Sequence, residues 1–172
     1  MDGNAGVINY AIYENGSRYI GIAKVTMPDK NNKTFTVNGA AIAGDLELPV
    51  IGKHDAMKMT INFTDVTESA YILAEERIHI VEIRVVHENI DPTASVLGIS
   101  KHKYVAEIIP LLLNGGNLES ASPQAVSGEY SVLSWKEYID DKLVDDTDPF
   151  RFRDVDHTGT DRLAEVRSFL GL

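Results

Sequence analysis

Apolar and polar positions alternate along much of the chain, and this alternation predicts a protein built mainly from β-strands. Residues 55–65 show it most cleanly, with apolar side chains at the odd positions from Met57 to Phe63 and polar ones between them. A period of two is typical of a strand with one buried and one solvated face. We expect further strands over 78–90, 101–119, 128–139 and 150–155. The first of these should be the longest, and Pro110 should interrupt the second because proline cannot donate to a sheet ladder.

An Asn15-Gly16 pair predicts a tight hairpin near the start of the chain. Both central residues of a type I′ turn need positive φ, which Asn and Gly tolerate best. The flanking strands are expected over 8–13 and 18–26. In the second strand, strict alternation would place Ile20, Ile22 and Lys24 on one face.

The segment between the hairpin and residue 55 is less regular. Residues 29–34 are polar and are expected to form a loop, and 35–51 combine β-forming residues with glycine and proline. We expect a short strand from 35, a flexible crossing segment around 40–44, and another short strand over 45–48.

Two segments have helical spacing. Thr67 suits the N-cap of a helix over 67–76, and the last residues, 161–172, have Leu163, Val166 and Leu170 on one side of a helix. A mainly β chain with two short helices predicts an antiparallel β-barrel or sandwich.

Composition narrows the chemistry that the fold can carry. The 172 residues include 26 Asp and Glu against 16 Lys and Arg, a net charge of −10, and no cysteine. Without thiols, disulfide frameworks, cysteine-ligated zinc, iron–sulfur clusters and cysteine nucleophiles are excluded.

The length fits a single domain over 1–172, with an extended loop or arm around 37–54. The acidity argues against a surface that grips nucleic acid or anionic lipid. No signal peptide or membrane span is evident, so we expect a soluble protein made in a cytoplasm.

The segment from Asp154 to Glu165 resembles a calcium-binding loop. Oxygen-bearing side chains stand at its first, third and fifth positions, glycine at the sixth and a carboxylate at the twelfth. Two features oppose this reading: Asp161 occupies a position that is normally apolar, and the entering segment looks like a strand. The alternative is a turn at Gly159 that leads into a helix with an acidic start.

The acidic residues after 139 and the histidines are two further groups of candidate site residues. The acidic stretch of Asp140, Asp141, Asp145, Asp146 and Asp148 suggests a solvated loop or the lining of a pore more than a metal or acid–base cluster. The five histidines lack ligand spacing; His79 and His87 share a strand face but stand too far apart for one metal. The remaining histidines are His54, His102 and His157. We therefore assign no catalytic, cofactor-binding or metal-binding residue and expect no enzyme and no cofactor.

Long strands and an extended arm create sheet edges that need a cover. A neighbouring subunit is the usual one, so the sequence favours oligomerisation. The alternative is a monomeric barrel whose edges pair internally.

The chain resembles the major tail tube proteins of contractile-tailed bacteriophages. The resemblance lies in the opening hairpin, 9–28, and in the small-residue segment 39–44 that leads into Leu46-Glu47-Leu48-Pro49. It is most specific at the end, in Asp161, Leu163-Ala164, Arg167 and Leu170-Gly171-Leu172. The order of elements covers essentially the full length. The segment 137–160 departs from the family, which has a shorter hairpin there.

This resemblance implies a tube fold shared with type VI secretion tubes, siphophage tail tubes and R-type bacteriocin tubes. It implies hexameric rings that stack into a hollow tube inside a contractile sheath, with strands of neighbouring subunits joined around the lumen. The implied partners are the sheath, tape measure, baseplate and tail terminator proteins, and the implied location is the virion tail, assembled in the host cytoplasm. DNA would pass through a net negative lumen without specific binding.

Three alternatives remain open at this level. One is a monomeric β-barrel that binds a small ligand. Another is the tube of a DNA-free R-type bacteriocin or type VI secretion-like system. The last is a calcium-dependent adhesion or enzyme module based on residues 154–165.

Overall fold

The computed structural model describes residues 3–21, 23–39, 43–91 and 96–172. Over these residues the chain forms eleven strands and two short helices. In chain order they are β1 (Gly3–Glu14), β2 (Arg18–Gly21), β3 (Ala23–Thr26), β4 (Asn32–Val37), β5 (Leu46–His54), β6 (Met57–Phe63), α1 (Glu68–Leu73), β7 (His79–Asp91), β8 (Val96–Asn114), β9 (Ser127–Ile139), β10 (Lys142–Asp148), β11 (Arg153–Val155) and α2 (Ala164–Leu170). The mainly β prediction with two short helices is therefore confirmed.

The main sheet is antiparallel and curls into a barrel. Its strand order is β11-β10-β9-β8-β7-β1-β2, and β6 pairs with both β9 and β3. The first half of β9 pairs with β6 and the second half with β10, so the sheet divides there. Because β2 pairs with β1 and β3 pairs with β6, the segment 18–26 links the β2 end of this path to the β6 branch on β9. This link closes the antiparallel barrel that the sequence predicted.

The closing segment is kinked rather than straight. The predicted Asn15-Gly16 turn is present, with φ of 51° and 72°, and Gly21 then adopts a φ of 109°. Ile20 is buried on β2, whereas on β3 it is Val25, opposite Ile61, that packs against the core. The expectation that Ile20 and Lys24 share a face is therefore wrong. After the kink, odd-numbered residues such as Val25 point inward instead of even-numbered ones. Ile22 lies outside the described residues.

The barrel interior is filled with side chains. Strand β6 alternates as predicted, and its four apolar residues from Met57 to Phe63 are at most 4% exposed. Burying each such side chain is worth about 1.5–3 kcal/mol. Helix α1 contacts β2 and β9 and adds Ala70 and Leu73 to this core. Thr67 occupies the N-cap of α1 as predicted, but its side chain makes no capping hydrogen bond.

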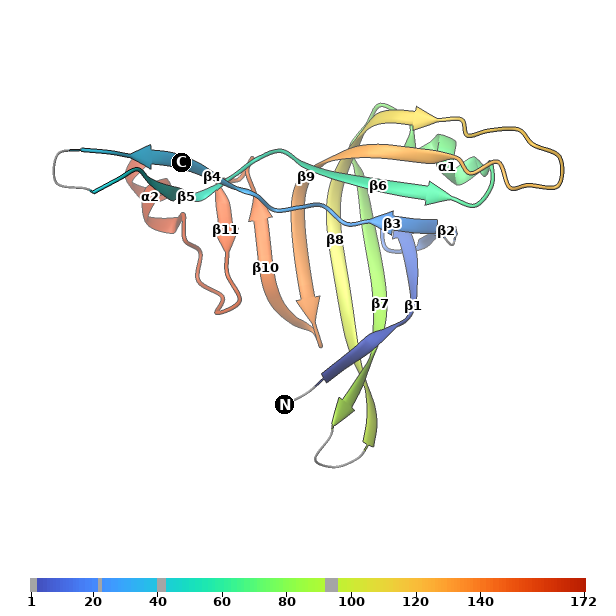
Figure 1. The fold of residues 1–172 in the computed structure, drawn as a ribbon, viewed down its shortest axis with the longest axis horizontal. Coiled ribbons are helices and arrows are strands. Elements are labelled where there is room, and N and C mark those ends of the chain that lie inside the picture. Colours follow the sequence, from blue (N-terminus) through green and yellow to red (C-terminus); the bar gives the residue numbers. More distant parts are fainter. Residues whose placement is uncertain (1–2, 22, 40–42, 92–95) are drawn as a thin grey trace.

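Strands β7 and β8 form a long ribbon that extends beyond the barrel (Figure 1). The longest strand is β8, with 19 residues, and not the segment 78–90 as expected. Pro110 does not interrupt β8. Pairing with β7 ends at Ile108, so beyond that position β8 has a neighbour on the β9 side only, and a bulge follows Pro110. A proline is tolerated where one ladder is missing.

The predicted acidic loop after residue 139 is instead a hairpin. Asp140 and Asp141 have φ of 46° and 66° and form its turn, and β10 then pairs back along β9. Strand β9 has a bulge opposite Glu107 of β8, and beyond this extra residue the odd-numbered positions are buried instead of the even-numbered ones. Both Val132 and Trp135 therefore face the core. Strict alternation through 128–139 did not predict this change.

Strands β4 and β5 pair only with each other in the described chain and form an arm, defined here as residues 32–54 (Figure 1). The predicted loop over 29–34 overlaps β4, and the predicted strand over 45–48 continues to residue 54. Most of the expected crossing segment, 40–42, lies outside the described residues. The arm packs closely at Gly52, where an added Cβ would lie 2.5 Å from the Leu163 side chain.

The closing helix is shorter than the predicted 161–172. It begins after Leu163, which is buried, and ends at Gly171 with a φ of 73°, a conformation suited to glycine at a helix C-terminus. Val166 and Leu170, expected on one side with Leu163, are exposed. Within the described residues, none of the helices has both the length and the apolar character required to span a membrane.

Candidate assembly surfaces

The main sheet has two open edges, one on each side of the molecule (Figure 1). Strand β2 covers β1 only from Ile12 to Glu14, and among the described residues no strand pairs with the outer edge of β1 before Ile12. Strand β11 covers β10 only from Asp146 to Asp148. A stretch of strand that no neighbouring strand covers is a template on which another strand can pair.

Large apolar side chains are exposed around the β7–β8 ribbon and the adjoining start of β1. Successive residues of a strand point to opposite faces, so these side chains expose apolar surface on both faces of the ribbon, and exposed apolar surface of this kind marks interaction sites. We call this set the ribbon patch: Val7, Ile8, Ile90, Val96, Leu97 and Ile99, each between 44% and 67% exposed.

A second apolar group lies on α2 and the turn before β11. Phe169 is 92% exposed and Phe150 is 83% exposed. Val166, Leu170 and Leu172 are also exposed, so nothing in the described chain covers the apolar face of α2. The arm adds further exposed apolar side chains at Phe35, Leu46, Leu48 and Ile51.

A buried ion cluster fixes the opening hairpin to the start of β7. The Glu14 carboxylate is buried and accepts from His79 Nδ1 at 2.7 Å and from Arg77 at 2.9 Å. The other nitrogen of His79 lies 3.0 Å from the carbonyl of Glu75. Burial would raise the pKa of Glu14, but the hydrogen bonds from His79 and Arg77 outweigh it and lower this pKa below its usual range.

In the loop that resembles a calcium site, residues 154–165, the first carboxylate is paired with basic side chains of the protein itself. Asp154 is fully buried, and its carboxylate pairs with Lys30 at 3.4 Å, with His54 at 3.5 Å and with Arg162. Burial would raise the pKa of Asp154, but the charges of Lys30, Arg162 and His54 hold this pKa below its usual range. We call these four residues the Asp154 cluster. It joins the arm, the β3–β4 link and the segment before α2.

The other carboxylates of that candidate loop accept hydrogen bonds from backbone groups. Asp156 accepts from the amides of Thr158 and Thr160, and Asp161 accepts from the amides of Asp154 and Leu163. The entering segment is strand β11, as the opposing reading expected. The geometry is that of a turn stabilised by side-chain caps. No group of three or more His, Asp or Glu side chains among the described residues is arranged to hold a metal ion.

The acidic stretch divides between the surface and the interior. Asp140 and Asp141 are exposed at the hairpin turn, whereas Asp146 and Asp148 are buried and pair with Arg153 and Arg151. Asp145 lies 2.7 Å from the amino group of Lys30. The expected solvated loop or pore lining is therefore wrong for these last three carboxylates, which form ion pairs within the fold.

The histidines occupy four different environments. His54 belongs to the Asp154 cluster, His79 binds the buried carboxylate of Glu14, and His157 is exposed. His87 and His102 stack on neighbouring strands with ring centroids 4.2 Å apart. Burial, and then the proximity of His87, lowers the pKa of His102. Spacing along the sequence could not reveal this cross-strand contact, because it depends on the β7–β8 register.

The family model described as "Phage tail tube protein FII" matches residues 5–171. The chain belongs to this family. Its members are structural tail tube proteins and not enzymes, so the assignment of a structural role and the prediction of no enzyme are confirmed. No curated protein matches the chain.

Solved structures extend the comparison of this tail tube protein to contractile injection particles. A chain of the "PVC sheath/tube terminator in extended state", from an extracellular contractile injection system, has a TM-score of 0.55 at 10% identity, covering 76% of this chain and 94% of that chain. A chain of the anti-feeding prophage tube-terminating cap has a TM-score of 0.48 at 10% identity, covering 76% and 86%. The first similarity demonstrates a shared fold.

Two features of this tail tube protein are not evident from its sequence. The open edges of β1 and β10 follow from the strand order, and the Asp154 cluster follows from contacts between residues far apart in the chain. The sequence did indicate that edges needed a cover, because its strands are long and its arm extended.

Proposed function

We propose that the protein forms hexameric rings that stack into the inner tube of a contractile phage tail and that this tube conducts DNA during ejection. In this proposal residues 1–172 act as one tail tube domain, with the arm around 37–54 extending from it. The particle is the virion, and assembly takes place in the host cytoplasm.

The observation that carries the proposal is the pair of open edges at opposite sides of one sheet. An edge of β1 on one subunit and an edge of β10 on the next make a head-to-tail contact, and such a contact generates a ring if its rotation closes. Backbone pairing across this contact would make one continuous sheet around the ring and leave no open edge.

The apolar surfaces supply further contacts. The ribbon patch lies at the opposite end of the molecule from the arm and α2, so the two regions can serve the neighbouring ring and the sheath as well as the lateral contact (Figure 1). The similar fold of a sheath/tube terminator chain from a contractile injection system supports a sheath protein and a tail terminator as partners, and we propose the baseplate as a further one. A tape measure protein inside the tube completes the proposed set.

The face of β7 and β8 that points away from the barrel core is the proposed lumen wall. It carries cations such as Arg84, Lys101 and Lys103 together with anions such as Glu82 and Glu107, and Arg84 is paired with Glu82. The net charge of −10 is therefore not concentrated on this face. Mixed charge without a continuous cationic stripe suits DNA that slides without specific binding.

Light scattering and electron microscopy test the proposal together. We expect concentration-dependent rings or tubes with sixfold symmetry, and an Ile8→Lys variant at the β1 edge should remain monomeric and folded. The control, Glu76→Lys, changes an exposed residue outside both edges and should assemble normally. A wild-type protein that stays monomeric at high concentration, even with sheath protein present, would contradict the proposal and favour the small-ligand barrel.

A further inference from the structure

Asparagine is followed by glycine at three places in the chain, and the structure distinguishes one of these pairs chemically. They are Asn15-Gly16 in the first hairpin, Asn38-Gly39 after β4, and Asn114-Gly115 at the end of β8. In such a pair the peptide nitrogen of the glycine can attack the side-chain amide of the asparagine, because glycine has no Cβ to obstruct the approach. Neither the family nor the ring proposal assigns a reaction to any of the three.

The side chain of Asn114 is folded back over the peptide group that follows it. Its Oδ1 accepts a hydrogen bond from the backbone N–H of Gly116 at 3.0 Å, which closes an Asx-turn around Gly115. Because the turn contains only these three residues, the amide carbon Cγ of Asn114 stays close to the nitrogen of Gly115. The hydrogen bond also draws electron density from Cγ, as a donor in an oxyanion hole does. The amide is thus both positioned and activated for attack.

The donor of this hydrogen bond is fixed in place. Gly116 has a φ of 71°, and a Cβ added to it would overlap the carbonyl oxygen of Gln124, so only glycine fits there. The side-chain amide of Gln124 donates to the carbonyl of Gly115 at 2.7 Å, and its backbone carbonyl accepts from Asn117 at 3.1 Å. The opposite side of the loop therefore holds the turn in the conformation that the reaction needs.

The pair at Asn114 is also open to water. Asn114 and Gly115 are exposed and begin the loop between β8 and β9, at the end of the molecule opposite to the arm (Figure 1). The other two pairs lack the activating contact, since no group among the residues that the structure describes donates to the side chain of Asn15 or Asn38. Asn15 instead forms the first hairpin turn with a φ of 51°.

We propose that Asn114 and Gly115 cyclise spontaneously in the folded protein and that Asn114 is thereby deamidated. The nitrogen of Gly115 gives its proton to water or hydroxide and forms a bond to Cγ of Asn114. The bond between Cγ and Nδ2 breaks, and this nitrogen takes up a proton and leaves as ammonia. Water then opens the five-membered succinimide at either carbonyl and yields aspartate or isoaspartate. Water is the only co-reactant in this sequence.

The product alters the loop in two ways. Either product adds one negative charge, and isoaspartate also places an extra methylene group in the main chain at the last residue of β8. Asn114 pairs with Ser127 of β9, so the extra group disturbs the end of this ladder. The reaction uses residues of one chain alone and stands independently of the ring proposal.

Peptide mapping by mass spectrometry tests the proposal with two internal controls. Full-length protein is kept in mildly alkaline buffer at a concentration where it is monomeric, and replacement of the amide by a carboxyl group is followed at all three pairs. We expect Asn114 in the folded protein to convert several-fold faster than Asn15 and Asn38, and several-fold faster than Asn114 itself in urea. Equal rates at the three folded pairs would overturn the proposal, and so would a rate at Asn114 that is no higher folded than in urea.

Two substitutions separate the attacking nitrogen from the turn that positions the amide. Gly115→Ala has open space around its Cβ, so it should fold normally and slow the reaction several-fold both folded and in urea. Gln124→Ala leaves the reacting atoms intact and removes the donor to Gly115, so it should lower only the folded rate. An unchanged rate in Gly115→Ala would exclude its nitrogen as the attacking group. An unchanged folded rate in Gln124→Ala would refute the role of the turn.

Discussion

Replacing Asp154 with Asn should destabilise the fold through the Asp154 cluster. The substitution keeps the side-chain shape but removes the charge that pairs with Lys30 and Arg162 and lies beside the His54 ring. Breaking a fully buried pair costs about 3–5 kcal/mol, because the remaining charge is buried alone. Here Lys30 and Arg162 are 27% and 41% exposed and can be hydrated, and Lys30 keeps Asp145 as a partner. We therefore expect a smaller loss of about 1.5–3 kcal/mol at pH 7, the range for hydrogen bonds to charged groups.

The pH dependence has a definite sign. The pKa of Asp154 is lower in the folded than in the unfolded protein, so the folded state binds fewer protons. Its contribution is fully present above the unfolded pKa, near about 4, and is lost as pH falls through the lower folded value. The difference between wild type and Asp154→Asn should therefore be constant from about pH 6 to 7 and shrink below about pH 4.

Urea unfolding at a concentration where the protein is monomeric measures both effects. The control is Asp141→Asn, which makes the same charge change at an exposed turn position where Asn tolerates the φ of 66°. The control should change the free energy of unfolding by less than about 0.5 kcal/mol. If Asp154→Asn costs no more than the control, or if its cost does not vary with pH, the reasoning about the cluster is refuted.

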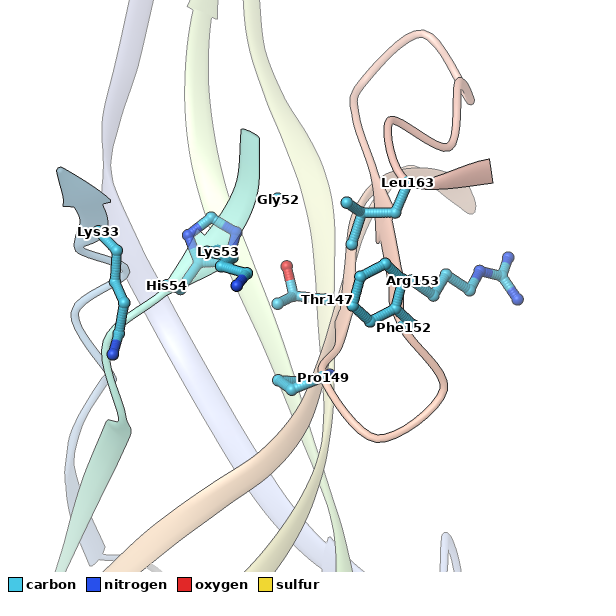
Figure 2. A pocket seen from close by; sticks show the side chains of 9 residues that line it. All are labelled: Lys33, Gly52, Lys53, His54, Thr147, Pro149, Phe152, Arg153 and Leu163. Atoms are coloured by element: carbon cyan, nitrogen blue, oxygen red, sulfur yellow. The ribbon is translucent and has the colours of Figure 1, made fainter. Parts of the chain in front are cut away.

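Three further substitutions probe the packing and the buried polar groups. Gly52→Ala should cost about 1–3 kcal/mol or more, because its Cβ would overlap Leu163 (Figure 2) and its φ of 66° disfavours a side chain; an unchanged melting temperature would contradict both the close contact and the strained backbone. His79→Ala should cost about 2–3 kcal/mol in urea unfolding, because it removes a hydrogen bond to the buried Glu14 carboxylate; a cost below about 1 kcal/mol would argue against the pair. Burial raises the pKa of Tyr130 to about 12, and its buried hydroxyl has no partner among the described residues. Tyr130→Phe should therefore be neutral or slightly stabilising and should remove the last tyrosine step in an absorbance titration at alkaline pH.

Local features of the fold were predictable because they depend on neighbours in the sequence. The alternation from Met57 to Phe63 predicted a half-buried strand, and the Asn15-Gly16 pair predicted a turn with positive φ at both positions. Both features were found. The limits of strict alternation appeared at Gly21 and in β9, where a kink and a bulge shift the buried face by one residue. One extra residue reverses the parity of a strand, and nothing in the pattern marks where it occurs.

The candidate sites were harder to predict, because identical carboxylates take opposite roles. Asp141 is exposed at a turn, while Asp154 is buried within an ion cluster, and the two look alike in the sequence. The partners of Asp154 stand as far as 124 residues away along the chain. Only packing brings such residues within reach of one another. The sequence alone therefore determined the mainly β character, the first hairpin and the need to cover long strands. The tertiary structure decided which edges stay open and which charges are paired, because both depend on long-range pairing between segments.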